Sequence, residues 1–117
     1  MPWLLEELRT LASGAGISGP AAAGSETQAF VFETILTAIL MFTILNVSGR
    51  PLVRLLTVAT AVGAVIALSA LWAGPVCGAS LNPARSLAPA LVTATYTSLW
   101  LYLVAPLCGA EIGRAHV

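Results

Sequence analysis

Two long apolar stretches dominate the first half of the chain. They cover about residues 29–47 and 52–72, and each approaches the roughly 20 residues that a helix needs to cross a bilayer. Gly49 and Pro51, which both stop helices, lie between them. The pattern therefore predicts two membrane-spanning helices joined by a short turn.

Shorter apolar stretches follow in the second half. A short helix is predicted over residues 83–92, and a third apolar run covers residues 99–110, which is too short to cross a bilayer. The connection Ala73–Leu81 is too irregular for a helix and too apolar for an ordinary loop in solvent. We therefore expect one partial span and one unusual apolar loop in this half.

The two ends of the chain differ from its middle. Residues 1–28 combine leucines at helical spacing with a stretch rich in Gly, Ala and Ser, which predicts an amphipathic segment and a loop. Arg50 and Arg54 place the first inter-helix turn on the cytoplasmic side, so residues 1–28 are expected to be extracellular. Residues 111–117 break the apolar run and match the translation of a common sequencing adapter, so we expect a non-native tail there.

The composition is typical of a membrane protein. Hydrophobic residues make up 58% of the chain and charged residues only 9%, against about 25% charged residues in soluble domains. The net charge is zero, so no nucleic-acid surface is expected. Cys77 and Cys108 form neither a metal motif nor a disulfide framework, and no metal or cofactor is expected.

The polar residues most informative about function form the run Asn82-Pro83-Ala84-Arg85. Asn is a favourable N-cap and Pro suits the first position of a helix, so a helix should begin here. Non-helical backbone at membrane depth is tolerated only where it lines a cavity or is buried in protein. A loop that enters the membrane and meets this helix therefore implies a lumen.

These residues carry a family resemblance. The run Ala79–Leu87 resembles the second signature loop of the aquaporin and glycerol-facilitator family, the major intrinsic proteins, and Ala73–Leu87 is most similar to the nodulin-type members and their bacterial relatives. The resemblance covers about residues 29–110. It implies an all-α membrane protein, namely the C-terminal repeat of an aquaporin-like helical bundle, with about two full spans, a re-entrant loop with a half-helix and a truncated last span.

The resemblance also implies roles for individual residues around the lumen. The side-chain amide of Asn82, supported by Pro83 and Ala84 in the cap of the half-helix, would donate to the passing solute. Arg85 would be the fixed member of the selectivity constriction and would repel cations. Two further positions that decide the solute are aligned from Arg85 and are drawn from span two and from the loop: Ala70 and Ala79.

The loop itself has an implied architecture. Gly78, Ala79 and Ser80 would form an extended strand that exposes a ladder of backbone carbonyls to the lumen. Glu33 lies inside the first span, four residues before Thr37 and on the same helical face. By resemblance, Glu33 would accept hydrogen bonds from the loop backbone, so that Glu33 and Thr37 serve as a scaffold and take no part in transport chemistry.

Each of these assignments has a simpler alternative. Asn82 could cap an exposed helix after an ordinary turn, Arg85 could reach lipid headgroups, and Glu33 could reach water from near the helix end. An intramembrane enzyme built on these three residues would need a nucleophile with its base or a metal site. The sequence contains no such set.

The implied function is a passive channel for water and small uncharged solutes such as glycerol, urea and metalloid acids, and not an enzyme. The channel would lie in a plasma or inner membrane as a multi-pass protein, and its full-length form would be a homotetramer. Its partners would be the solutes, the lipid bilayer and the missing first repeat of the same protein. Two alternatives stay open, namely a non-functional truncated membrane polypeptide and, at full length, a strict water channel.

Overall fold

Helices account for the regular structure of the part of the chain that the structure describes. The computed structural model describes residues 1–6, 19, 26–48 and 54–117, and no strand occurs in these ranges. Besides a short helical stretch over residues 2–6, the helices are these: α2 (Glu26–Val47), α3 (Arg54–Trp72), α4 (Gly74–Cys77), α5 (Pro83–Thr93) and α6 (Leu99–Ala115). The predicted all-α fold is confirmed. The predicted N-terminal segment and the turn around Arg50 lie largely outside the described residues.

Two of the helices have the length and composition of membrane spans. Residues Glu26–Val47 and Leu55–Trp72 are long and apolar enough to cross a bilayer. α2 begins three residues before the predicted boundary at residue 29, with Glu26 in its first turn, where a negative charge is favourable. Both predicted spans are therefore helices, with small shifts at their ends.

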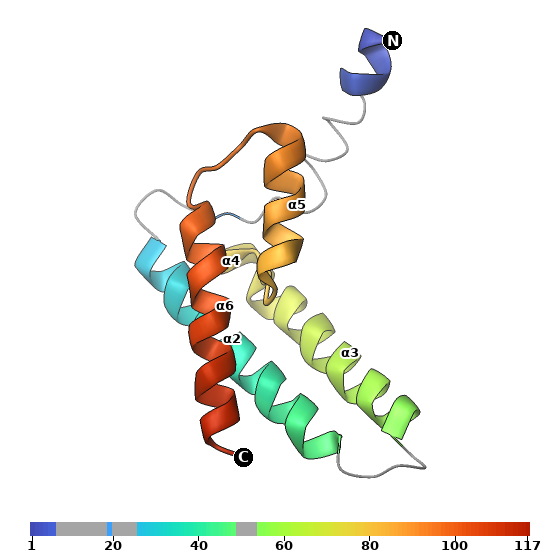
Figure 1. The fold of residues 1–117 in the computed structure, drawn as a ribbon, viewed down its shortest axis with the longest axis vertical. Coiled ribbons are helices and arrows are strands. Elements are labelled where there is room, and N and C mark those ends of the chain that lie inside the picture. The colour runs from blue at the N-terminus through green and yellow to red at the C-terminus, as the bar shows by residue number, and fades with distance from the viewer. Residues whose placement is uncertain (7–18, 20–25, 49–53) are drawn as a thin grey trace.

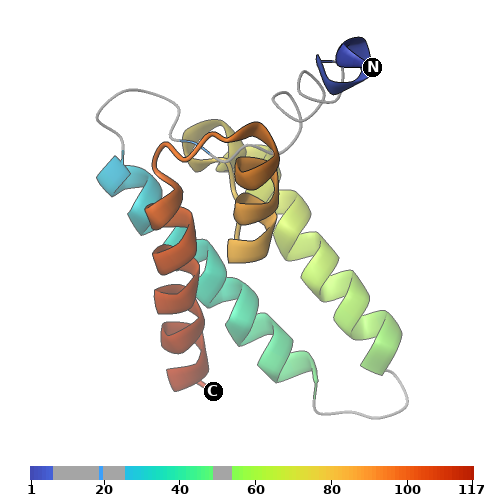
Figure 2. The same cartoon turned by 45° about the horizontal axis from the view of Figure 1, so that its top comes forward.

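The frame of the molecule is a parallel pair formed by α2 and α6, which lie side by side in Figures 1 and 2. At their first turns, Ser98 donates a hydrogen bond to the carboxylate of Glu26, and the rings of Phe30 and Trp100 stack with centroids 5.9 Å apart. Further along, Gly109 brings the two backbones close together. α2 and α6 therefore run in the same direction. The 26 residues between the end of α3 and the start of α6 contain α4 and α5.

Glycine is required at the closest approach of α2 and α6. A Cβ atom built on Gly109 would stand 2.3 Å from the backbone oxygen of Thr34, and one on Gly113 would stand 2.4 Å from that of Ala38. Neither neighbour is a flexible side chain, so the helices would have to separate. In lipid, such small residues are what allows two backbones to pack.

We expect Gly109→Ala to destabilise the helix pair by about 1–3 kcal/mol, since overpacking moves backbone. The measurement is the unfolding of the chain in detergent micelles as SDS is added, followed by circular dichroism. Gly63→Ala is the matched control, because nothing lies within 4 Å of a Cβ at that position of α3. An equal response of the two variants would contradict the tight contact.

The connection Ala73–Leu81 corrects one expectation. It was predicted to contain no helix, yet Gly74–Cys77 form the single turn α4. Pro75 stands at the start of the turn, where its missing N–H costs nothing. Gly78 ends the turn at φ 83°, and its N–H bonds the oxygen of Gly74 at 2.8 Å. The rules for helix ends thus apply even to one turn.

α6 also extends beyond its predicted boundary at residue 110. It continues to Ala115, and Glu111 and Arg114 form an exposed ion pair of 2.8 Å on successive turns. Side chains three apart on a helix are neighbours, which favours this continuation weakly. The non-native origin of residues 111–117 stays a prediction.

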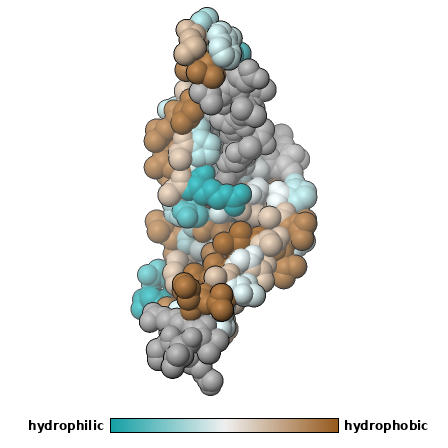
Figure 3. Space-filling model, turned by 90° about the vertical axis from the view of Figure 1, so that its right-hand side faces the viewer, coloured by the Kyte–Doolittle hydropathy of each residue, from teal (hydrophilic) through white to brown (hydrophobic). Residues whose placement is uncertain are grey.

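The outward surfaces of the helices are apolar. On α3, Leu55 is 83% exposed and Leu71 is 78% exposed. Hydrophobic side chains dominate the α3 side of the molecule around a small hydrophilic patch near its middle (Figure 3). Such exposed apolar surface suits lipid or further protein and not water.

Candidate functional site

The chain enters the molecule and turns back between α3 and α6. In Figure 2 the segment after α4 descends to the start of α5, and α5 then climbs back beside the upper part of α6. With 11 residues, α5 is about 16 Å long, or about half of the ~30 Å hydrocarbon thickness of a bilayer. The structure therefore contains a half-helix preceded by a re-entrant loop.

Asn82 and Pro83 begin the half-helix. Asn82 has extended backbone (φ −150°, ψ 119°), and its Oδ1 accepts a hydrogen bond of 2.9 Å from the N–H of Ala84. Pro83 takes the first helical position. The side chain of Asn82 is exposed, and its amide nitrogen is not used by the cap. The positive end of the α5 dipole and an amide donor thus meet at one point.

Glu33 fastens the loop to α2. Its side chain is fully buried, Oε1 accepts a bond of 2.7 Å from the N–H of Ser80, and Oε2 accepts one of 2.8 Å from the N–H of Leu81. Thr37 donates to the backbone oxygen of Glu33 at 2.7 Å. A single carboxylate therefore satisfies two successive loop donors that would otherwise be buried without partners.

These two bonds explain a departure from the expected extended strand. Successive N–H groups of a strand point to opposite sides, whereas those of Ser80 and Leu81 both reach Glu33. The backbone accordingly leaves the extended region at Ala79 (φ 43°) and Leu81 (φ 58°). Left-handed backbone costs a residue other than glycine about 1–2 kcal/mol. The carboxylate of Glu33 offsets this cost.

Arg85 binds the same loop. Its Nη1 donates a hydrogen bond of 2.9 Å to the backbone oxygen of Ala79, and the residue is otherwise exposed in part. The structure therefore brings together two of the residues predicted for the constriction. Ala70, the third, is exposed near the end of α3. Among the predicted carbonyl residues, Gly78 is half-buried, whereas Ala79 and Ser80 are buried.

Two further contacts of the loop were not anticipated from the sequence. Tyr102, fully buried on α6, donates a bond of 2.6 Å to the backbone oxygen of Cys77. The hydroxyls of Ser80 and Ser86 lie 2.6 Å apart, and that of Ser80 also donates to the backbone oxygen of Asn82 at 2.9 Å. In the sequence, the one sign of such a contact was Tyr102 within the apolar run 99–110, because the hydroxyl of a buried tyrosine usually finds a polar partner.

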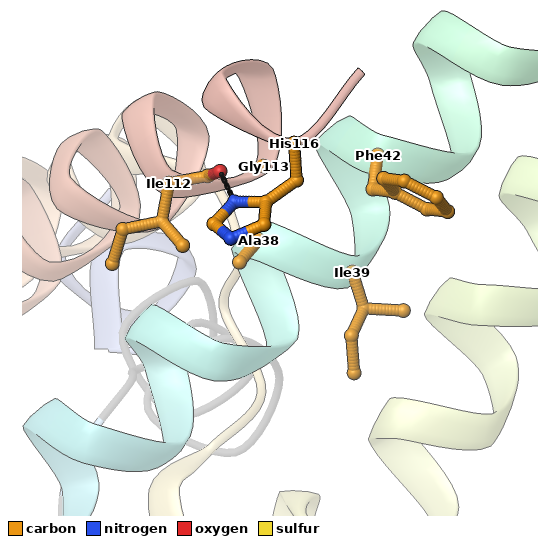
Figure 4. Close-up of a pocket in the computed structure, with 6 residues that line it drawn as sticks. All are labelled: Ala38, Ile39, Phe42, Ile112, Gly113 and His116. Atoms are coloured by element: carbon orange, nitrogen blue, oxygen red, sulfur yellow. Dashed lines mark hydrogen bonds between the residues drawn. The ribbon is translucent and has the colours of Figure 1, made fainter.

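Two hollows flank these elements. One of about 230 Å³ has Asn82, Thr37 and Leu81 among its lining residues, so it adjoins the start of the half-helix. The other, of about 270 Å³, lies between α2 and the end of α6 (Figure 4). It is lined by apolar groups and by His116, whose Nδ1 lies 2.7 Å from the oxygen of Ile112. Only the first hollow is part of the candidate site.

Comparison with known proteins gives consistent matches. The family model described as Major intrinsic protein matches residues 4–116. Aquaporin NIP1-1 of Zea mays is 52% identical over 92 residues, which are 77% of this chain and 32% of the maize protein. Nodulin-26 of Glycine max is 45% identical over 96 residues, which are 82% of this chain and 35% of the soybean protein. The chain thus spans about a third of the length of the curated relatives it matches.

Proposed function

The chain belongs to the major intrinsic protein family, and from this premise we propose that it forms part of a passive membrane channel for water and small uncharged solutes. Aquaporins of this family are channels and not enzymes, and they are multi-pass membrane proteins. Because the chain spans about a third of its relatives, the rest of the lumen would come from a first repeat of the same protein. The complete channel would be a homotetramer in a plasma or inner membrane.

The observation that supports a channel most strongly is the half-helix α5, whose preceding loop is bound by Glu33. α5 begins at Asn82, and a buried Glu33 holds the preceding backbone at two points. A buried carboxylate, two left-handed residues and a polar helix end are costly in apolar surroundings unless they line a path for polar molecules. The exposed amide nitrogen of Asn82 would donate to a passing hydroxyl, and the helix dipole would disfavour cations.

The identity of the constriction residues supports the class of solute. Ala79 and Ala70 are small and add no side-chain donor, so the opening beside Arg85 would be wide. Arg85 would supply a donor for hydroxyl or carbonyl oxygen and a charge that repels cations. We therefore infer that glycerol, urea and uncharged metalloid acids pass. A strict water channel is the alternative in which the other repeat narrows the opening.

The test is a chimera in which residues 26–110 replace the matching segment of maize Aquaporin NIP1-1. Purified chimera is placed in liposomes, and shrinking and swelling in water, glycerol and boric acid gradients are followed by stopped-flow light scattering. Glycerol and boric acid entry above that of protein-free liposomes supports the proposal. Water flux without solute entry supports the strict water channel, and no flux from well-folded chimera overturns the channel.

Ala70 offers a graded test of the wide constriction. We expect Ala70→His in the chimera to reduce glycerol entry several-fold and to leave most of the water flux, because a larger polar side chain narrows the opening. Ala64→His is the matched control, since Ala64 is also exposed on α3 but points about 120° away from Ala70 around the helix. Equal loss of glycerol and water in the Ala70 variant would contradict this placement.

A further inference from the structure

The loop before α5 is held from two helices and not from one. From α2, Glu33 binds the N–H groups of Ser80 and Leu81. From α6, the hydroxyl of Tyr102 binds the backbone oxygen of Cys77, 25 residues earlier in the chain, at 2.6 Å. Tyr102 is fully buried, so this bond does not compete with water. The close packing of α2 on α6 makes these two anchors one rigid frame.

The anchor from α6 fixes one peptide unit. The oxygen of the Cys77–Gly78 peptide accepts from Tyr102, and its N–H donates to the oxygen of Gly74 at 2.8 Å. Gly78 adopts φ 83°. Both polar groups of this peptide therefore have a partner, although Gly78 by itself is the most freely rotating position in the loop. Without the phenol, that oxygen would lose its bond. The bonds left beside it would be those from the N–H of Gly78 to Gly74 and from the N–H of Ala79 to the sulfur of Cys77 at 3.4 Å.

The fixed peptide stands one residue before the carbonyl that Arg85 binds. Ala79 follows Gly78 directly, and its oxygen accepts from Nη1 of Arg85 at 2.9 Å. Ala79 also has left-handed backbone (φ 43°), which is held only while its neighbours are held. A rotation at Cys77–Gly78 would displace the oxygen of Ala79, and the guanidinium of Arg85 would follow it or lose its bond.

We propose that Tyr102 is a positioning residue that sets the Ala79–Arg85 pair and, through it, the preference of the channel among small solutes. This inference rests on the proposed function and adds a residue to it that does not itself touch solute. A placed oxygen and a placed guanidinium match the spacing of hydroxyl groups on a polyol, whereas water needs only one bond at a time. Loss of placement should therefore harm glycerol entry more than water entry.

The first arm of the test measures the anchor without transport. Cys77 is buried and Cys108 is exposed. The rate at which N-ethylmaleimide labels Cys77 in the 117-residue chain in detergent, followed by mass spectrometry, therefore reports on opening of the loop. The labelling rate of Cys108 is the internal reference. Tyr102→Phe removes one oxygen atom and should speed labelling of Cys77 roughly fivefold, the effect of one lost hydrogen bond, with Cys108 unchanged. Tyr96→Phe is the matched control because Tyr96 is 55% exposed. Unchanged labelling of Cys77 in Tyr102→Phe overturns the anchor.

The second arm measures solute preference in the chimera with maize Aquaporin NIP1-1. The ratio of glycerol to water permeability should fall in Tyr102→Phe and stay at the parental value in Tyr96→Phe. The ratio does not depend on the amount of folded protein. If Tyr102 had a purely structural role, Tyr102→Phe would lower both permeabilities and leave their ratio unchanged. An unchanged ratio therefore overturns the positioning role. A parental chimera without flux would instead overturn the proposed function, while the labelling arm would still decide the anchor.

Discussion

Replacing Glu33 with alanine is expected to release the loop before α5 and to remove roughly 2–6 kcal/mol from the free energy of unfolding. Two buried backbone N–H groups, those of Ser80 and Leu81, would lose their acceptors, and each such loss costs about 1–3 kcal/mol. Proteins are stable by only about 5–15 kcal/mol, so the loss would be a large share. SDS titration of the chain in micelles, followed by circular dichroism, measures it.

Glutamine at this position separates the charge from the shape of the side chain. Glu33→Gln keeps one oxygen acceptor but turns an NH₂ group toward the other N–H, so we expect an intermediate loss of about 1–3 kcal/mol. Glu111→Gln is the control, since its side chain is 69% exposed and its ion pair with Arg114 contributes little. Stability of Glu33→Ala equal to that of the parent would contradict the role of Glu33 as the loop's anchor.

The second large effect is expected at Asn82. Substitution by aspartate distinguishes the two roles of its side chain, which caps α5 and would donate a hydrogen bond to solute. Asn82→Asp keeps an oxygen for the N–H of Ala84 and adds a charge that the start of α5 favours, so the stability should not fall. The variant loses the amide donor and places a negative charge on the path. We expect at least about a tenfold loss of glycerol and water permeability, the effect of one donor worth ~1.4 kcal/mol or more.

Asn82→Ala completes the comparison. It removes both the cap and the donor, and should therefore lower stability by about 0.5–2 kcal/mol together with the flux. Unfolding in micelles and stopped-flow scattering on the maize chimera give the two readings. If Asn82→Asp conducts as well as the parent, the amide does not act on the solute and Asn82 is only a helix cap.

Features that depend on a few neighbouring residues were predictable from the sequence. The apolar lengths around residues 29–47 and 52–72 predicted α2 and α3, because crossing a bilayer is a matter of length and hydrophobicity. Asn82 followed by Pro83 predicted the start of α5 to the residue, because capping acts within one turn. The turn α4 was missed although Pro75 and Gly78 carry the same local chemistry, since a helix of four residues has no periodicity to detect.

The contacts that make these helices a site come from tertiary structure. Glu33 meets donors 47 and 48 residues away, and Tyr102 meets an oxygen 25 residues away. The residue pattern alone places Glu33 as an acid inside a span, and a family resemblance was needed to expect a loop as its partner. Which N–H groups it binds depends on how α2 packs against the segment that follows α4. Local propensity sets helices and their ends because it acts within one turn, whereas the partner of a buried polar group depends on which helices pack.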